Sequence, residues 1–177
     1  SEEEVKLCVT LVHQLSLALE RLRLFGQVGA SRDVLIFALA KLAESRDDDT
    51  GGHLERICGY TRTVAEALRH HDRFRRVIDE RYLDDLYRSA ALHDIGKVGI
   101  SDEVLEKEGS LTDADWAVIR HHTVVGYDMV KSLEGLTDRH LEIVRSHHER
   151  YDGRGYPDGL KGDEIPLLVR IMAAADM

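Results

Sequence analysis

Hydrophobic positions near the start of the chain repeat at alternating intervals of three and four residues. The residues in this series are Val5, Cys8, Val12, Leu15, Leu19 and Leu22. Such spacing places apolar side chains on one side of a helix, as in a coiled coil; an amphipathic helix packed on its own domain fits equally well. Gly26 and Gly29 predict a break after this helix. We therefore assign residues 1–29 to an N-terminal linker helix and residues 30–177 to the main domain.

The apolar positions of the main domain predict a succession of helices joined by polar turns. Helical spacing begins near residues 31, 53, 79, 112, 137 and 166. Asp, Ser, Thr and Pro residues at or just before these starts are typical of helix N-termini. The one β-like stretch is Lys97–Ile100, and the sequence contains no internal repeat. The pattern therefore predicts an all-α domain.

Composition restricts the classes of protein that fit this chain. The hydrophobic fraction of 43% and the charged fraction of 32% are typical of a folded protein. No apolar run approaches the roughly 18 residues of a membrane span, and Ser1–Glu4 lacks the basic start of a signal peptide. Cys8 and Cys58 are expected to be reduced core thiols, which favours a cytoplasmic location. The net charge of -9 argues against a nucleic-acid polymer as the main partner.

Histidines and aspartates interrupt the apolar side of several predicted helices. These residues are His53, His93, Asp94, His122, His147, His148 and Asp176. Burying such a group costs several kcal/mol unless it is paired or binds a metal. Imidazole and carboxylate together suit Fe, Mn, Co, Ni or Zn, and a carboxylate can bridge two ions. Seven such groups exceed the needs of one ion and fit two ions, the arrangement used in phosphoryl transfer.

The other histidines have a simpler interpretation. We expect them to be ordinary core or surface residues, and they are His13, His70, His71, His121 and His140.

The candidate ligands lie in longer motifs that resemble a known enzyme family. The motifs are DTGGHLERI, ALHDIGKVGI, HHTVVGYDMV, HHERYDGRGYPDGLKGDEIP and RIMAAAD. From about residue 31 onward the chain resembles the HD-GYP domain cyclic di-GMP phosphodiesterases of the HD superfamily of metal-dependent phosphohydrolases. The resemblance implies an all-α HD-domain helical bundle. It also implies hydrolysis of cyclic di-GMP to pGpG in bacterial second-messenger signalling, with further hydrolysis to GMP left open.

The resemblance implies a division of the seven ligands between two divalent ions, Fe or Mn. One ion would be bound by His53, His93 and Asp176, the other by His122, His147 and His148, with Asp94 bridging both. His122 is chosen over His121 because the family motif has a glycine four residues after its histidine, here Gly126.

The same resemblance implies roles in catalysis and substrate binding. Asp94 and Lys97 would be catalytic, and Lys97 would contact the phosphate or the leaving oxygen, where its charge can stabilise negative charge. Tyr156 and Arg154 would border the substrate. Asp49 stands where family members with a third ion have a glutamate, so it is the candidate ligand of an extra ion, although two ions are predicted.

Two further features affect the functional interpretation. The sequence ends one residue after Asp176, where the family continues with further helices, so we expect the C-terminal end of the domain to be incomplete. The N-terminal helix can join an upstream sensor domain or pair two subunits. The alternatives to hydrolysis are a non-catalytic sensory module that binds nucleotide, and a di-iron oxygenase with the HD fold.

Overall fold

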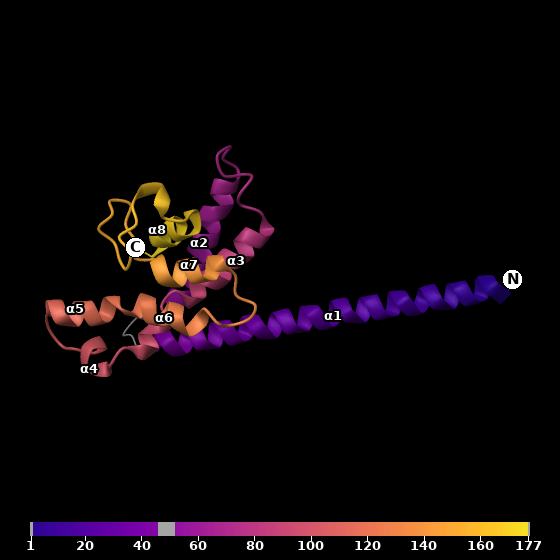
Figure 1. Cartoon of the computed structure of the whole chain (residues 1–177), viewed down its shortest axis with the longest axis horizontal. Coiled ribbons are helices and arrows are strands. Elements are labelled where there is room, and N and C mark those ends of the chain that lie inside the picture. Colours follow the sequence, from indigo (N-terminus) through magenta and orange to yellow (C-terminus); the bar gives the residue numbers. More distant parts are fainter. Residues whose placement is uncertain (1, 46–51, 177) are drawn as a thin grey trace. The chain divides into compact units, whose positions relative to one another are not determined.

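The computed structural model describes residues 2–45 and 52–176, and the regular elements in these ranges are helical (Figure 1). The elements are α1 (Glu2–Glu44), α2 (His53–Arg69), α3 (Glu80–Leu92), the 3-10 helix η1 (Ile95–Gly99), α4 (Asp102–Leu105), α5 (Asp113–Arg120), α6 (His122–Val130), α7 (Asp138–Ser146), the 3-10 helix η2 (Gly162–Glu164) and α8 (Leu167–Ala175). One isolated β-bridge joins Asp152 and Lys161. The predicted all-α class is confirmed.

The chain divides into two compact units, Ser1–Leu35 and Ile36–Met177. The predicted boundary between residues 29 and 30 stays a prediction. No helix in the described ranges is both long enough and apolar enough to span a membrane.

Helix α1 continues through Gly26 and Gly29, so the predicted break at these glycines is wrong. A glycine inside a helix costs only about 0.5–1 kcal/mol relative to alanine, which the surrounding helix-forming residues can offset. Val12, Leu15 and Leu19 of the predicted seam are exposed in the single chain. The side chains of the other seam residues, including Cys8, lie outside the described set.

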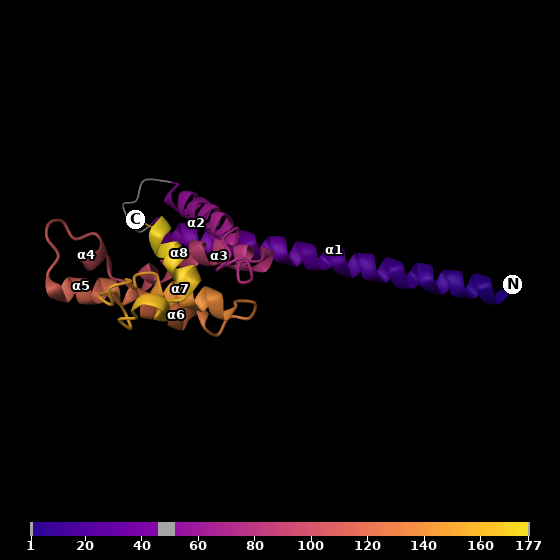
Figure 2. The same ribbon diagram turned by 90° about the horizontal axis from the view of Figure 1, so that it is seen from above.

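The helices of the second unit enclose one hydrophobic core. Helix α2 packs on α3 and α8, and α7 packs on α3, α6 and α8 (Figures 1 and 2). Leu83, Leu86 and Ala90 of α3 are buried at helical spacing and meet the buried Ile143 and Val144 of α7 in this core. Burial of each large aliphatic side chain stabilises the fold by about 1.5–3 kcal/mol. This core fixes the helix ends that carry the candidate ligands.

Most helices begin where the sequence pattern predicts. Asp79 precedes α3 and its carboxylate accepts the Tyr82 N–H at 2.7 Å. Thr112 precedes α5 and forms a capping box with Asp115. Both contacts satisfy backbone donors that a helix leaves free in its first turn. Most of the β-like stretch Lys97–Ile100 lies in the 3-10 helix η1, in keeping with the predicted all-α class.

The 3-10 helix η1 and helix α6 approach each other through two glycines. A Cβ atom on Gly96 would lie 1.9 Å from the carbonyl oxygen of His122 and 2.6 Å from the amide nitrogen of Gly126. Only a residue without a side chain fits at this distance. The contact brings His93 and Asp94, which directly precede η1, close to His122, the first residue of α6.

We expect Gly96→Ala to lower the free energy of unfolding by about 1–3 kcal/mol or more, because the added methyl group collides with backbone. Urea unfolding followed by circular dichroism measures this change. Gly59→Ala in α2 is the matched control, since no heavy atom lies within 4 Å of its added Cβ. The control should gain about 0.5–1 kcal/mol. Equal stability of the two variants would contradict the role given to the glycine contact.

Candidate metal centre

The seven predicted ligands gather at helix ends in the second unit. They form two groups that could each hold a metal ion, with candidate ligand atoms within 4.8 Å of one another: Asp94, His122, His147 and His148 in one, and His53, His93 and Asp176 in the other. The first residues of α2 and α6 and the residues just after α3, α7 and α8 supply them. Helix C-termini carry partial negative charge, so three of these five ends favour a cation.

Asp94 lies between the two groups. Its Oδ2 atom is 3.2 Å from Nε2 of His93. Its Oδ1 atom is 3.2 Å from Nε2 of His122 and 3.5 Å from Nε2 of His147. The two carboxylate oxygens therefore face different histidines, which is the geometry of a carboxylate that bridges two ions.

The second group closes around the end of α8. Nε2 of His53 lies 3.6 Å from Oδ1 of Asp176, and Nε2 of His93 lies 4.0 Å from the same oxygen. On the other side, the imidazole of His148 packs against that of His147 with ring centroids 4.2 Å apart. The two groups thus meet at the adjacent residues His93 and Asp94.

Backbone carbonyls orient three of the imidazoles. In each of them Nδ1 lies within hydrogen-bonding distance of a carbonyl oxygen three or four residues earlier. The pairs are His93 with Ala90 at 2.8 Å, His122 with Ile119 at 2.7 Å and His147 with Ile143 at 3.0 Å. A neutral imidazole that donates from Nδ1 keeps the lone pair of Nε2 for a metal. The helical backbone therefore selects the tautomer that a metal ligand needs.

Two buried polar atoms support the fit of a cation. Nε2 of His93 and Oδ1 of Asp94 are buried and have no hydrogen-bond partner among the described residues. Most buried polar atoms are hydrogen-bonded, so these two require another partner. Nitrogen and oxygen donors are the ligands that Fe, Mn and Zn accept. The residues present therefore fit a pair of divalent ions.

The electrostatics of the site also favour positive charge. Burial would lower the pKa of His93, but the neighbouring Asp94 carboxylate outweighs it and raises this pKa to about 9. Burial would raise the pKa of Asp94, but the positive charge of the neighbouring His93 outweighs it and holds this pKa well below its usual range. Burial, followed by the charge of His147, lowers the pKa of His148 to about 3, so that imidazole is neutral at pH 7. Ionised Asp94 thus lies beside a positively charged His93 imidazole, with the neutral imidazole of His148 nearby, and the carboxylate already attracts positive charge.

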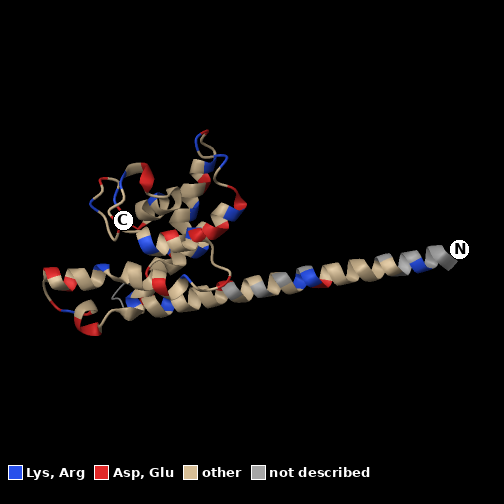
Figure 3. Ribbon diagram, viewed as in Figure 1, with Lys and Arg blue, Asp and Glu red and all other residues tan. Residues whose placement is uncertain are grey.

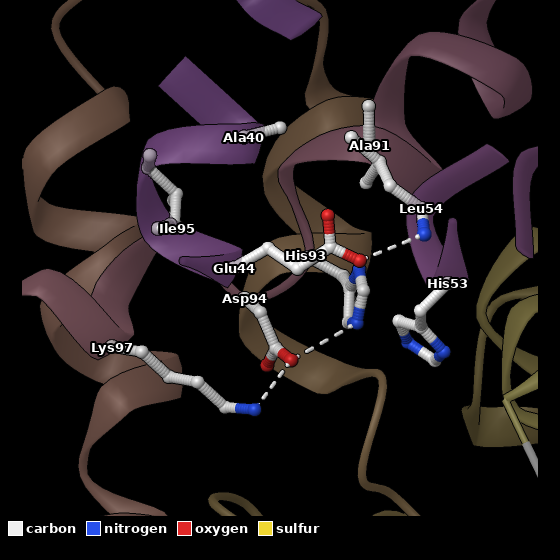
Figure 4. A pocket seen from close by; sticks show the side chains of 10 residues that line it. Ala40, Glu44, His53, Leu54, Ala91, His93, Asp94, Ile95 and Lys97 are labelled. Atoms are coloured by element: carbon white, nitrogen blue, oxygen red, sulfur yellow. Dashed lines mark hydrogen bonds and ion pairs between the residues drawn. The ribbon is translucent and has the colours of Figure 1, made fainter. Parts of the chain in front are cut away.

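Lys97 and Tyr156, predicted from the sequence, both adjoin the metal centre. Nζ of Lys97 lies 2.8 Å from Oδ2 of Asp94, and Figure 4 shows Asp94 between Lys97 and His93. The Tyr156 ring stacks on the His148 imidazole with centroids 4.7 Å apart. Burial raises the pKa of Tyr156 to about 12, so its hydroxyl stays protonated and can donate a hydrogen bond.

An open groove of about 910 Å³ borders the centre. Its lining includes His148, Asp176, Tyr156 and three arginines, Arg120, Arg150 and Arg154. Lys and Arg are interspersed with Asp and Glu over the second unit, which therefore shows no continuous basic surface in this view (Figure 3). Positive charge at the groove comes from individual side chains, the three arginines.

The three groove arginines have different surroundings. Arg150 makes two hydrogen bonds to the Asp152 carboxylate, at 3.2 and 2.9 Å. The backbone N–H of Arg154 donates to the same carboxylate at 3.0 Å, which orders the loop at that residue. The Arg120 guanidinium lies 5.5 Å from the centre of the Tyr156 ring. Sequence reasoning missed Arg120, because its place beside Tyr156 depends on a contact between distant parts of the chain.

Comparison with known proteins agrees with this geometry. The sequence pattern of the HD domain matches residues 38–177. The chain belongs to the HD-domain family. The family expected from the motifs is thereby confirmed.

The HD domain also has named relatives. The chain is 43% identical over 165 residues to a "Probable cyclic di-GMP phosphodiesterase" of Vibrio cholerae, covering 89% of this chain and 37% of the relative. It is 38% identical over 172 residues to the "Cyclic di-GMP phosphodiesterase response regulator RpfG" of Xanthomonas campestris, covering 94% of this chain and 43% of the relative. A "3'3'-cGAMP-specific phosphodiesterase 2" of Vibrio cholerae is 33% identical over the whole chain and 33% of its own length. The chain thus spans between a third and a half of these relatives.

The remaining predicted positions are distributed as follows. Asp49, the candidate ligand of an extra ion, lies outside the described residues. His140 is buried in the HD domain and its Nδ1 accepts the backbone N–H of Thr137 at 3.1 Å, as expected of an ordinary core histidine. His13, His70, His71 and His121 belong to neither candidate metal group.

Glu149 is a structural residue that sequence reasoning missed. It directly follows the histidine pair and is only 3% exposed. Its carboxylate accepts the backbone N–H groups of Asp158, Gly159 and Leu160 at 2.7, 3.0 and 2.9 Å. Three such bonds satisfy a buried charge and tie the loop that carries Tyr156 to the end of α7. An acidic residue between a histidine pair and a glycine-rich loop was the available signal.

Replacement of Glu149 by Gln should lower the free energy of unfolding by about 2–4 kcal/mol. The amide has one acceptor oxygen, and its NH₂ group would face backbone N–H donors in a buried site. Chemical denaturation measures the change. Glu66→Gln, in an exposed ion pair with Arg62, is the control and should change stability by less than about 1 kcal/mol. A Glu149 variant as stable as this control would refute the role of the carboxylate.

Proposed function

We propose that this chain hydrolyses a phosphodiester bond of cyclic di-GMP to give pGpG, with two divalent ions, Fe or Mn. The proposal rests above all on Asp94, whose two oxygens face separate groups of nitrogen donors beside Lys97. Relatives named cyclic di-GMP phosphodiesterases support the substrate. The presence of a donor side chain at all seven ligand positions favours an enzyme over a non-catalytic sensory module.

The ions would be held as the family resemblance implies. The first would take His53, His93 and Asp176, the second would take His122, His147 and His148, and Asp94 would bind both. Such a pair of ions supplies Lewis acidity, lowers the pKa of water and neutralises phosphate charge.

The chain's own residues would orient the substrate and stabilise charge. Lys97 would donate a hydrogen bond to the phosphate or to the leaving 3′ oxygen, because its ammonium group is held next to Asp94 at the edge of the centre. Tyr156 would donate from its protonated hydroxyl. Arg154 and Arg120 would attract the second phosphate from the wall of the groove, since guanidinium groups suit phosphate oxygens.

The assembly and location of the protein are also proposals. We infer that residues 1–29 link the HD domain to an upstream sensor or pair two copies, supported by the exposed Val12, Leu15 and Leu19. The buried free thiol of Cys58 supports a reducing, cytoplasmic environment.

The proposal is tested by turnover of cyclic di-GMP by anaerobically purified protein loaded with Fe²⁺ or Mn²⁺, with products separated by chromatography. We expect pGpG from metal-loaded wild type, and a loss of more than about 100-fold in His148→Ala and Asp94→Ala, because each removes a metal ligand. A parallel assay with 3′3′-cGAMP addresses the substrate named for other relatives.

The outcomes of this assay separate the competing functions. Metal binding without hydrolysis of either cyclic dinucleotide would contradict the phosphodiesterase, and metal-dependent oxygen uptake would then favour an oxygenase. Binding of nucleotide without turnover would favour the sensory module.

Arg120→Ala is expected to raise the KM for cyclic di-GMP about tenfold while kcat changes little, since the residue lines the groove and lies outside the metal groups. Steady-state kinetics at saturating metal measures both constants. Arg62→Ala, on the exposed side of α2, is the matched control and should leave KM unchanged. An unchanged KM in the Arg120 variant would remove this residue from the substrate site.

A further inference from the structure

Helix α2 begins with a metal-ligand candidate but has no N-cap side chain of its own. Its N-cap residue is Gly52, at φ +100°, and no side chain at that position bonds to the helix. The first N–H groups of a helix need acceptors from elsewhere. Here Oε1 of Glu44, the last residue of α1, accepts the Leu54 N–H at 3.0 Å (Figure 4). The cap of α2 therefore comes from another helix.

A second contact also joins the end of α1 to the start of α2, but it is exposed to solvent. Nζ of Lys41 lies 2.6 Å from the Glu55 carboxylate, and both side chains are more than half exposed. Exposed ion pairs contribute little to stability. The bond from Glu44, in contrast, is partly buried and acts on the backbone of the residue that follows His53.

Glu44 also borders the metal centre without joining either group of ligand atoms. It lines a small cavity together with His53, His93, Asp94 and Lys97. Within the described chain, Glu44 belongs to neither candidate metal group. Glu44 thus lies next to the candidate ligands, and its Oε1 accepts a backbone N–H. These two features are those expected of a residue that supports a ligand.

We propose that Glu44 is a positioning residue for His53, an inference that rests on the proposed metal centre. By holding the Leu54 N–H it fixes the first turn of α2, and so the direction of the His53 imidazole toward Asp176. His53 is the one ligand candidate of its group that begins a helix, and that helix has no side-chain cap at its own N-cap residue. Loss of the Glu44 acceptor should therefore weaken the ion held by His53 and spare the other.

The test is calorimetric titration of the metal-free full chain with Mn²⁺. Wild type should bind two ions. Glu44→Ala should raise the Kd of one ion about 10–100-fold, the usual effect of losing a group that orients a ligand. The weakened ion should be the one that His53→Ala abolishes. Glu44→Gln should stay within about threefold of wild type, because its amide oxygen can still accept the Leu54 N–H.

Glu55→Ala is the matched control, because it breaks the exposed ion pair at the same junction and leaves the cap intact. It should leave both affinities unchanged. The proposal is overturned if Glu44→Ala binds both ions like wild type. It is also overturned if Glu44→Gln loses affinity as severely as Glu44→Ala, which would make the carboxylate a ligand, or if both ions weaken equally with loss of helical circular dichroism. Failure of wild type to bind Mn²⁺ would instead refute the proposed metal centre itself.

Discussion

The partly buried carboxylate of Asp94, whose Oδ1 atom is enclosed, is the constraint to which the surrounding structure responds. An ionised group removed from water is costly unless charge or hydrogen bonds compensate it. Here His93 lies on one oxygen and His122 and His147 lie on the other, and Lys97 reaches the same carboxylate from the edge. The positive charge of His93 explains why the pKa of Asp94 is held low despite its limited contact with water. The carboxylate and the imidazoles around it also make the place favourable for divalent ions.

The geometry around Asp94 depends on the backbone as much as on the ligands. The glycine contact between η1 and α6 sets the distance from Asp94 to His122, and helical carbonyls fix the imidazole tautomers. Glu149 then ties the loop after the histidine pair to the end of α7. Each of these contacts involves backbone groups, and folding requires buried backbone N–H and C=O groups to have partners. The stability of the domain and the order of its site are therefore coupled.

The sequence predicted the helical class, and it singled out the side chains that gather at the candidate metal centre, because both leave local signals. Polar residues on apolar faces are visible in the pattern, and the motifs around His93 and His147 are specific in order and spacing. The continuity of α1 was missed because Gly26 and Gly29 were read as breaks, although a helix can absorb two glycines. Arg120 and Glu44 could not be found this way. Their roles depend on Tyr156 and on Leu54, which lie 36 and 10 residues away and meet them only in the folded chain.

The last turns of α1 belong to the HD domain in a structural sense. Ile36, Ala40 and Ala43 are buried in the core of the second unit, and Glu44 follows directly. The family match likewise begins at residue 38, inside this helix. These last turns bury one face in the core and end at the cap of α2, so they have little freedom to move without disturbing His53. The last turns of α1, from Ile36 to Glu44, are thus part of the support of the candidate metal centre, and a change in them would act first on the start of α2, where His53 lies.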